Sequence, residues 1–247
     1  MDDIIEVNRL DVGYRDELVL ADLNFTVKAK EITVILGKSG CGKTTVLKTL
    51  IGLLPPLSGA VFFFGGKVDF YSEKSLQNLY HKIGVLYQGS ALLNSFSLYD
   101  NIALPIKMHY PHFPGAVEKE MVYTRLSQVG LLESAHKYPA ELSGGMRKRA
   151  ALARAMILDP EIIFCDEPTA GLDPITAAEL DRLMLNLKQH LGMTLVVVTH
   201  ELRSIDKIAD KALVLDSGRM HFFGEYREMA ALKDPFIDTF FLKKEKD

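Results

Sequence analysis

One octapeptide, Gly37-Lys38-Ser39-Gly40-Cys41-Gly42-Lys43-Thr44, constrains the fold of this chain more than any other segment. Its spacing is G-x-x-x-x-G-K-[ST], and it follows residues 31–36, a short β-branched apolar run that is typical of a buried parallel strand. Residues 44–54 continue with a helical pattern. Glycines allow a tight turn in which backbone N–H groups and the helix N-terminus point at one anion. A strand, a glycine-rich loop and a helix in this order predict an α/β domain built around a phosphate site.

The last residues of this loop have the side chains that nucleotide chemistry needs. Lys43 can reach the β- and γ-phosphates of ATP, and the Thr44 hydroxyl can ligate Mg²⁺. Thr45 belongs to the same helix start and is counted with the nucleotide-binding residues. The alternative is a glycine-rich turn that binds nothing. Gly-Lys-Thr in register after a strand argues against it.

Composition bounds the class of protein. The chain has 247 residues, 25% of them charged, and a formal net charge of −3. This length suits one large α/β domain, with or without a smaller inserted lobe. Basic residues occur only in short patches, so no nucleic-acid partner is expected. Cys41 and Cys165 are the two cysteines, which indicates no disulfide framework and favours a reducing cytoplasm.

The sequence also bears on membrane targeting. The first residues, 1–6, are acidic where a signal peptide would be basic, and no apolar run approaches the roughly 18 residues that cross a bilayer. A role at a membrane therefore requires another chain to provide the membrane part.

The first 88 residues are expected to be mostly strands. Strand-like stretches cover residues 4–10, 23–27 and 32–36, separated by polar loops, and strand character returns at 60–69 and 83–88, with a helix at 75–81 between them. Tyr14 precedes the phosphate loop and can either stack on an adenine ring or be a partly buried residue at a strand end; both remain open. Gln88 ends a strand, where open α/β sheets place ligand contacts.

Residues 89–160 change to a helical pattern and predict an inserted lobe, with helices over 116–129 and 145–158. The apolar residues between Leu92 and Tyr99 are either core beneath the lobe or a docking surface for a partner, and both remain open. Ser143 suits a helix N-cap, and Gly144 and Gly145 leave backbone N–H groups open to an anion. This is a second phosphate-binding helix start. The basic residues that follow it, Arg147, Lys148, Arg149 and Arg154, are also compatible with a solvated face.

Carboxylates and a histidine end the next two strands. Asp166 and Glu167 follow the buried run 162–165, and the pair supplies one carboxylate to hold Mg²⁺ through its hydration shell and one to polarise water. We assign Asp166 to the metal and Glu167 to the water. His200 follows the strand-like run 194–199 and is a candidate γ-phosphate sensor. Asp173 is a suitable N-cap, with Pro174 at the first helical position.

The C-terminal part is expected to close the fold. Residues 212–223 form a hairpin around Asp216-Ser217-Gly218. The tail from 234 to 241 has apolar residues that would share one helix face, suited to docking on this subunit or a neighbour. Residues from Lys243 are charged and expected to fray.

Taken in order and spacing, these motifs resemble those of an ABC-type ATPase subunit along nearly the whole chain. Leu142-Ser143-Gly144-Gly145, about a hundred residues after the phosphate loop, is the discriminating motif. The resemblance implies an α/β P-loop NTPase core with an N-terminal antiparallel β subdomain and an inserted helical subdomain. The expected boundaries are about 1–88 and 161–233 for the core with its β subdomain, 89–160 for the helical subdomain and 234–247 for a C-terminal tail.

The resemblance also implies a mechanism. Two copies form a head-to-tail dimer in which each ATP lies between the phosphate loop of one subunit and Ser143-Gly144-Gly145 of the other. The family pattern assigns Tyr14 to adenine stacking and Gln88 to Mg²⁺ and the attacking water. It makes Glu167 the general base, places His200 at the γ-phosphate, and lets Asp173 link the two sites.

One departure from the family pattern indicates a particular subfamily. Met146 stands where most members have Gln, and with residues 86–95, 100–105, His109 and 173–176 it resembles the ATPases of Mce/Mla-type lipid transporters. Leu93 is a mild variation from that pattern. The resemblance implies a permease dimer and a lipid-binding Mce protein as partners, phospholipid as cargo, and a place on the cytoplasmic face of the inner membrane.

Two other functions share the same motifs. One is the ATPase of a polar-solute importer, such as those for amino acids. The other is a soluble ABC protein that acts on ribosomes or DNA, although such proteins usually carry two cassettes or a long coiled-coil insertion, and neither is present in this sequence.

Overall fold

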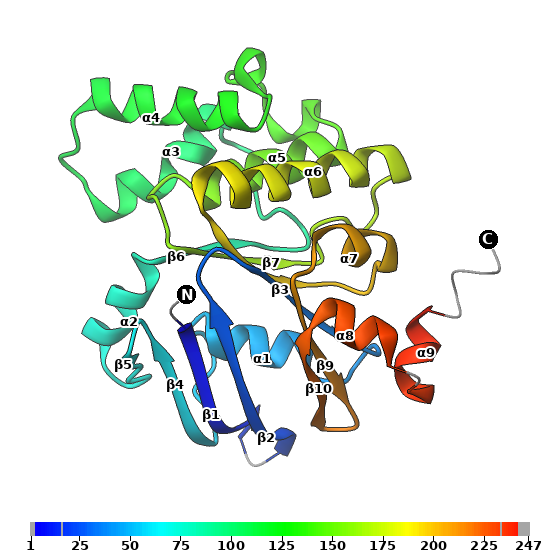
Figure 1. The fold of residues 1–247 in the computed structure, drawn as a ribbon. Helices are drawn as coiled ribbons and strands as arrows, with labels where there is room; N and C mark the ends of the chain where they lie inside the picture. Colours follow the sequence, from blue (N-terminus) through cyan, green and yellow to red (C-terminus); the bar gives the residue numbers. More distant parts are fainter. Residues whose placement is uncertain (1–2, 16, 233, 242–247) are drawn as a thin grey trace.

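The computed structural model describes residues 3–15, 17–232 and 234–241, and its elements are arranged in tiers (Figure 1). Helices form the upper tier, a six-stranded sheet crosses the middle, and a helix and a second sheet lie below it. This arrangement brings the ends of several central strands to one edge, which is where the site is found.

The central sheet is mostly parallel, with the strand order β10-β9-β3-β8-β7-β6. Only β10 pairs antiparallel to its neighbour, as the expected closing hairpin. β3, β7, β8 and β9 are almost wholly buried because helices or a second sheet cover both faces. The strands are β3 (Ile32–Gly37), β6 (Ile83–Leu86), β7 (Ile162–Asp166), β8 (Thr194–Val198), β9 (Lys211–Asp216) and β10 (Arg219–Glu225).

The second sheet is antiparallel, with the order β2-β1-β4-β5. Its strands are β1 (Asp3–Tyr14), β2 (Glu17–Lys28), β4 (Ser58–Phe63) and β5 (Gly66–Lys67). The prediction of polar loops between residues 10 and 23 is wrong, because β1 continues to Tyr14 and β2 begins at Glu17. Register shifts interrupt their pairing, and Arg9 and Asp22 have positive φ. These bulges break the alternation that identifies a strand in the sequence.

The first helix, α1 (Lys43–Leu50), lies between the two sheets (Figure 1). Its buried residues Val46, Leu47 and Leu50 join one core cluster with side chains from β1, β2 and β4 on one side and with Phe164 of β7 on the other. The phosphate loop is therefore held at the start of a helix that cannot move without disturbing both sheets.

Four longer helices form the upper tier: α3 (Leu98–His109), α4 (Gly115–Gln128), α5 (Gly144–Ala155) and α6 (Pro174–Leu191). α3, α4 and α5 share a core cluster of their own, which includes Leu98, Ile102 and Leu126. α3 was not predicted, because Pro105 lies inside it and removes one helical N–H. Between Leu92 and Tyr99 the structure is mixed, since Leu98 is fully buried while Leu93 is 42% exposed.

Short helices complete the fold: α2 (Glu73–Tyr80), α7 (Leu202–Ile208), α8 (Tyr226–Ala231) and the 3₁₀ turns Leu132–Ser134 and Pro139–Glu141. In the described part of the chain, no helix combines the length and the apolar character needed to cross a membrane.

The last described helix, α9 (Pro235–Phe241), docks on its own chain. Ile237 is 2% exposed and belongs to the core cluster formed by side chains of the central sheet and of the helices that pack on it. Asp234 accepts hydrogen bonds from the backbone N–H groups of Phe236 and Ile237, and its other carboxylate oxygen lies 3.0 Å from Nε2 of His221. The expected fraying from Lys243 lies outside the described residues.

Candidate functional site

Four parallel strands deliver the candidate residues to one edge of the central sheet. β3 leads into the phosphate loop, β6 toward Gln88, β7 into Asp166 and Glu167, and β8 toward His200. A cavity of about 910 Å³ opens there. It is lined by Val19, Gly37, Lys38, Ser39, Gly40, Gly42, Lys43, Thr44, Thr45, Gln88, Asp166, Glu167, Val198, His200 and Leu202. Residues that lie far apart in the sequence therefore share one pocket with the phosphate loop.

The backbone of the loop requires glycine at its two ends. Gly42 has φ of 103°, and a Cβ there would lie 2.6 Å from Leu20. At Gly37 a Cβ would lie 2.5 Å from the carbonyl oxygen of Leu215. Lys43 curls back over the loop and donates to the carbonyl oxygens of Gly37 at 2.8 Å and Lys38 at 3.0 Å. Its ammonium group is thus held at the mouth of the loop by weak acceptors that a phosphate can replace.

The two carboxylates differ in environment. Asp166 is half-buried, and its pKa is raised by burial and by the neighbouring charge of Glu167. Glu167 is 9% exposed and adopts a left-handed backbone conformation with φ of 46°. A non-glycine residue persists in that region only where its surroundings hold it. The backbone strain at Glu167 therefore indicates a side chain whose direction matters.

His200 fixes one oxygen of Glu167. Its Nδ1 lies 2.7 Å from Oε1 of Glu167, and since an ionised carboxylate only accepts, Nδ1 carries the proton and donates it. The second oxygen, Oε2, is buried without a hydrogen-bond partner among the described residues. An unpartnered buried carboxylate oxygen is costly, so this atom is the natural acceptor for a water or another group that enters the cavity.

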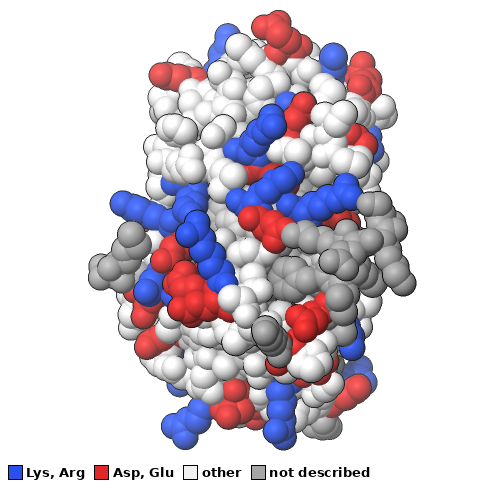
Figure 2. All heavy atoms as spheres, turned by 45° about the vertical axis from the view of Figure 1, so that its right-hand side comes forward, with Lys and Arg blue, Asp and Glu red and all other residues white. Residues whose placement is uncertain are grey.

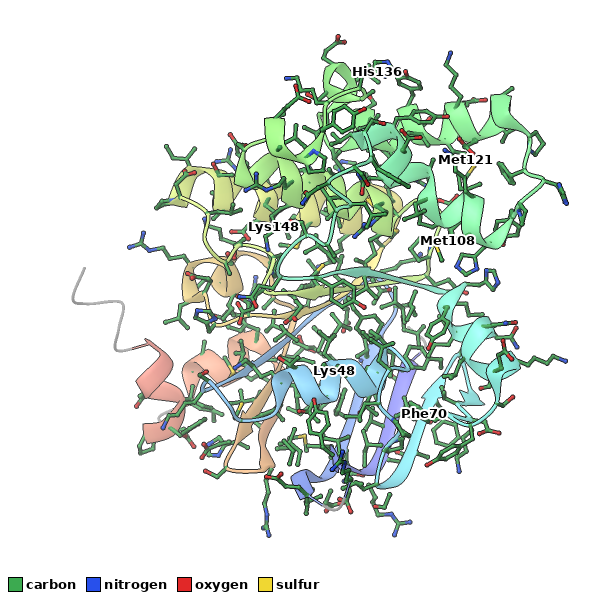
Figure 3. The ribbon with its side chains drawn as sticks, turned by 180° about the vertical axis from the view of Figure 1, so that it is seen from behind. Lys48, Phe70, Met108, Met121, His136 and Lys148 are labelled. Carbon is green, nitrogen blue, oxygen red and sulfur yellow. The ribbon has the colours of Figure 1, made fainter. Side chains whose placement is uncertain are left out.

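Lys148 belongs to this site, although the sequence did not predict it. The side chain is 5% exposed, and its Nζ donates to the carbonyl oxygens of Gln88 at 2.5 Å and Glu167 at 3.0 Å. Figure 3 labels it where α5 approaches the central sheet. The alternative that the basic residues of this helix form a solvated face does not hold for Lys148, which is buried. The available signal was its position on the buried stripe of α5 with Gly145, Ala151 and Leu152.

Some predicted residues do not line the cavity. Cys41 packs its sulfur against Gly37, and its N–H donates to the carbonyl of Lys38 within the loop. Tyr14 is 44% exposed and lies beside the pocket, where Lys48 Nζ is 3.3 Å from its hydroxyl. Hydrogen bonds with Thr45 and then Lys48 lower the pKa of Tyr14. The tyrosine is thus fixed next to α1 with its ring partly open to solvent.

The second glycine-rich helix start also lies outside this cavity. Ser143 caps α5 by accepting from the N–H of Met146 at 3.2 Å. Gly145 packs against α6, where an added Cβ would lie 2.2 Å from Cγ2 of Thr176. Asp173 caps α6 through the N–H groups of Ile175 and Thr176. Residues 143–145 and 173 therefore form a separate surface, and a single chain does not bring them to the phosphate loop.

The donors near the loop fit Mg²⁺ in type. Thr44, Gln88 and Asp166 line the cavity and offer a hydroxyl, an amide and a carboxylate, all hard oxygen ligands. Within the described residues, no group of three His, Cys, Asp or Glu side chains could hold a metal ion alone. A cation bound here would need oxygens from water or phosphate as well, which agrees with the way Mg²⁺ is usually held beside nucleotides.

Charges of both signs are mixed over the face shown in Figure 2. Lys and Arg side chains, in blue, gather across its middle with Asp and Glu between them. On this face, the positive charge is not a single extended patch.

Comparison with known families identifies the class. The model of the ABC transporter family matches residues 20–170, and the chain belongs to this family. It is an ABC ATPase domain, as the motifs predicted.

Curated relatives cover nearly the whole chain. The "Intermembrane phospholipid transport system ATP-binding protein MlaF" of Haemophilus influenzae is 38% identical over 99% of this chain and 92% of its own length. The "Probable ribonucleotide transport ATP-binding protein mkl" of Mycobacterium tuberculosis is 38% identical over 96% of this chain, which spans 66% of that relative. The "Methionine import ATP-binding protein MetN" of Carboxydothermus hydrogenoformans is 38% identical over 88% of this chain, which spans 65% of it.

Solved structures agree with the fold. CbiO1 from Clostridium perfringens, described as part of the ABC transporter complex CbiONQ, superposes with a TM-score of 0.87 at 29% identity, covering 99% of this chain and 100% of that one. The cassette MJ0796, solved as a dimer in a post-hydrolysis state bound to ADP and Pi, gives 0.80 at 27% identity over 90% and 98%. The predicted fold class is confirmed.

Proposed function

We propose that this chain is the ATP-hydrolysing subunit of a transporter that moves phospholipid between bacterial membranes. One observation carries the hydrolytic part: Lys43, Thr44, Gln88, Glu167 and His200 line a single cavity although they come from separate segments. The cargo is supported by the similarity to MlaF, which extends over 99% of this chain and 92% of the relative.

The chemistry follows from the contacts at the cavity. Lys43 exchanges two backbone carbonyls for the β- and γ-phosphates, which are stronger acceptors. Glu167 takes the proton of the attacking water at Oε2, the oxygen that has no partner among the described residues. His200 holds the other oxygen and keeps the carboxylate directed into the cavity. Gln88 orients the water with its side-chain amide.

Mg²⁺ would be held by Thr44, by Gln88 and, through water, by Asp166. When bound, it neutralises the charge that the phosphates carry and develop. Burial, and then the neighbouring charge of Glu167, raise the pKa of Asp166, and a nearby cation would favour the ionised form of Asp166.

A second copy of the chain completes each site. Ser143, Gly144 and Gly145 start a helix on a surface separate from the cavity, so they serve the nucleotide of the partner subunit. Asp173 lies on the α6 cap beside them and links the two sites. Tyr14 flanks the loop and stacks on adenine. The dimeric state of the MJ0796 structure supports this arrangement.

The remaining partners are membrane components. A permease would dock near residues 92–99, where Leu93 is 42% exposed. These residues lie in the helical subdomain (about 89–160), which adjoins the core (about 1–88 and 161–233). A lipid-binding Mce-type protein would complete the complex. The chain would then work on the cytoplasmic face of the inner membrane.

Two substitutions test the site. Lys43→Ala removes charge-assisted hydrogen bonds, so ATP affinity should fall about ten- to hundred-fold, measured by titration calorimetry with Lys74→Ala on α2 as the matched control. Unchanged ATP binding by Lys43→Ala would exclude the phosphate-loop assignment.

Glu167→Gln removes the general base but keeps the shape of the side chain. Turnover should fall about 10²- to 10⁴-fold, while ATP-driven dimerisation, measured by light scattering, remains. A Glu167→Gln variant that turns over at the normal rate would show that another group accepts the proton.

The leading alternative is the ATPase of a polar-solute importer, which the similarity to MetN favours. Purification from detergent extracts of membranes separates the two, because the phospholipid transporter should bring a permease and an Mce-type protein with bound lipid. Recovery with a solute-binding protein would favour the importer. Recovery with ribosomes and no membrane protein would refute both.

A further inference from the structure

Three parts of the site meet at one buried ammonium group. Lys148 lies on α5, the helix that begins with Ser143 and Gly145, and it reaches the backbones of Gln88 and Glu167. β6 and β7 are adjacent parallel strands, with Leu86 opposite Cys165. The lysine therefore closes the space just beyond their carboxyl ends.

The burial of Lys148 shows that its contacts are specific. Lys148 is 5% exposed, and burial lowers its pKa although the nearby carboxylates of Asp166 and Glu167 oppose this effect. A buried ammonium group is tolerated only where its donors find acceptors. Here two acceptors are main-chain carbonyls of loop residues that no strand pairing satisfies.

Both loop backbones need support. Glu167 has φ of 46°. Its N–H donates to the carbonyl of Val198, and its carbonyl accepts from Lys148 at 3.0 Å and from the N–H of Ala170 at 3.3 Å. After Gln88, Ser90 and Ala91 also have positive φ, at 62° and 50°. Arg154, two turns along α5, donates to both of their carbonyls, at 2.9 Å and 2.6 Å. One helix thus holds the loop after β6 at two places and the strained residue after β7 at one.

We propose that Lys148 is a positioning residue for hydrolysis. It fixes the backbones of Gln88 and Glu167 relative to each other, so that the side-chain amide of Gln88 and the carboxylate of Glu167 bind the same water. It also ties both to α5, the helix whose first residues serve the partner subunit's nucleotide. This rests on the proposed function, because it takes Glu167 as the base and Gln88 as the water ligand.

The test replaces Lys148 by methionine, which has a similar length and no donor, and by arginine, which keeps the donors. Lys148→Met should lower kcat about ten- to hundred-fold, the loss expected for hydrogen bonds from a charged group. KM for ATP should change less than about two-fold, since the phosphate loop is untouched. Lys148→Arg should retain more activity than Lys148→Met.

Hydrogen exchange gives a readout that a general loss of stability would not reproduce. In Lys148→Met, the amides of residues 88–91 and of Glu167 should exchange faster while those of β8 remain protected. Arg149→Met is the matched control, because it also removes a cation from α5. The guanidinium of Arg149 faces the carbonyl of Val129 and not the backbones of Gln88 and Glu167. It should leave kcat and these amides unchanged.

The outcomes separate this inference from the proposed function. Folded Lys148→Met with kcat within two-fold of the parent, or equal to that of Lys148→Arg, overturns it. Where Lys148→Met fails to fold, Lys148→Arg decides: kcat within ten-fold of the parent supports the inference, and a larger fall overturns it. If Glu167→Gln turns over normally, the assignment of the base fails and the inference fails with it. If Glu167→Gln loses turnover and Lys148→Met does not, the inference fails while the proposed function stands.

Discussion

Gly145 offers a test in which steric and chemical roles can be separated. In Gly145→Ala the new Cβ would lie 2.2 Å from Cγ2 of Thr176, whereas ordinary contacts begin at 3.4 Å. The neighbouring atom belongs to α6, whose start is fixed by the Asp173 cap, so α5 and α6 must move apart. Overpacking of this kind costs about 1–3 kcal/mol, which corresponds to a fall in Tm of roughly 2–12 °C for a domain of this size.

Thr176→Ser supplies the rescue. It removes Cγ2 and keeps the hydroxyl that donates to Asp173 at 2.5 Å. The next atom near the new Cβ is then Cβ of residue 176 at 3.7 Å, an ordinary contact. The double variant Gly145→Ala/Thr176→Ser should recover most of the Tm, measured by calorimetry against each single variant.

The same double variant tests the proposed contact with the partner's nucleotide. If the backbone at Gly145 must approach a phosphate closely, the double variant should regain stability without regaining ATP hydrolysis. The reasoning is refuted if Gly145→Ala has the Tm of the parent chain, or if Thr176→Ser restores none of the loss.

Three further predictions concern other parts of the chain. Hydrogen bonds from Thr176 lower the pKa of Asp173 below its usual 3.8, so its contribution to stability is present above that pH and is lost as the pH falls through the lower folded-state value. Asp173→Asn keeps an acceptor at every pH and should flatten the acid limb of the stability curve; an unchanged limb would contradict this. Cys165 is fully buried, with its pKa raised to about 12 by burial, so mass spectrometry after thiol labelling at pH 8 should find Cys41 modified and Cys165 protected until the chain unfolds. Ile237→Ala should release α9 locally, which would appear as faster hydrogen exchange at residues 236–238 with β7 unaffected; exchange that is accelerated equally in α9 and β7 would show that α9 is part of the cooperative core.

The central strands and the residues that follow them could be predicted because both signals are local. Runs such as 162–165 and 194–198 are continuously apolar, as strands covered on both faces must be, and the polar residue after each run then falls at the sheet edge. That rule placed Asp166, Glu167 and His200 together without any knowledge of their contacts.

What could not be predicted depends on partners distant in the sequence. Lys148 binds main-chain carbonyls, which every residue has, so nothing in the sequence marks Gln88 and Glu167 as its acceptors. α3 contains Pro105, and its start is held instead by the buried Asn101, whose side chain bonds to Leu93, Phe96 and Ser97. Whether residues 143–145 face a second nucleotide is a property of two chains and is absent from one.

The position of α9 beside the phosphate loop has a practical consequence for work on this protein. Phe236 lies under the ammonium group of Lys38, 4.9 Å from the ring centroid, and Lys38 is part of the phosphate loop. A purification tag or reporter that shifts α9 would therefore disturb the contact between Phe236 and Lys38 and alter the nucleotide affinity that is measured. The start of β1 lies on another side of the molecule from α9 (Figure 1), so fusions ahead of Asp3 are the safer choice for binding assays.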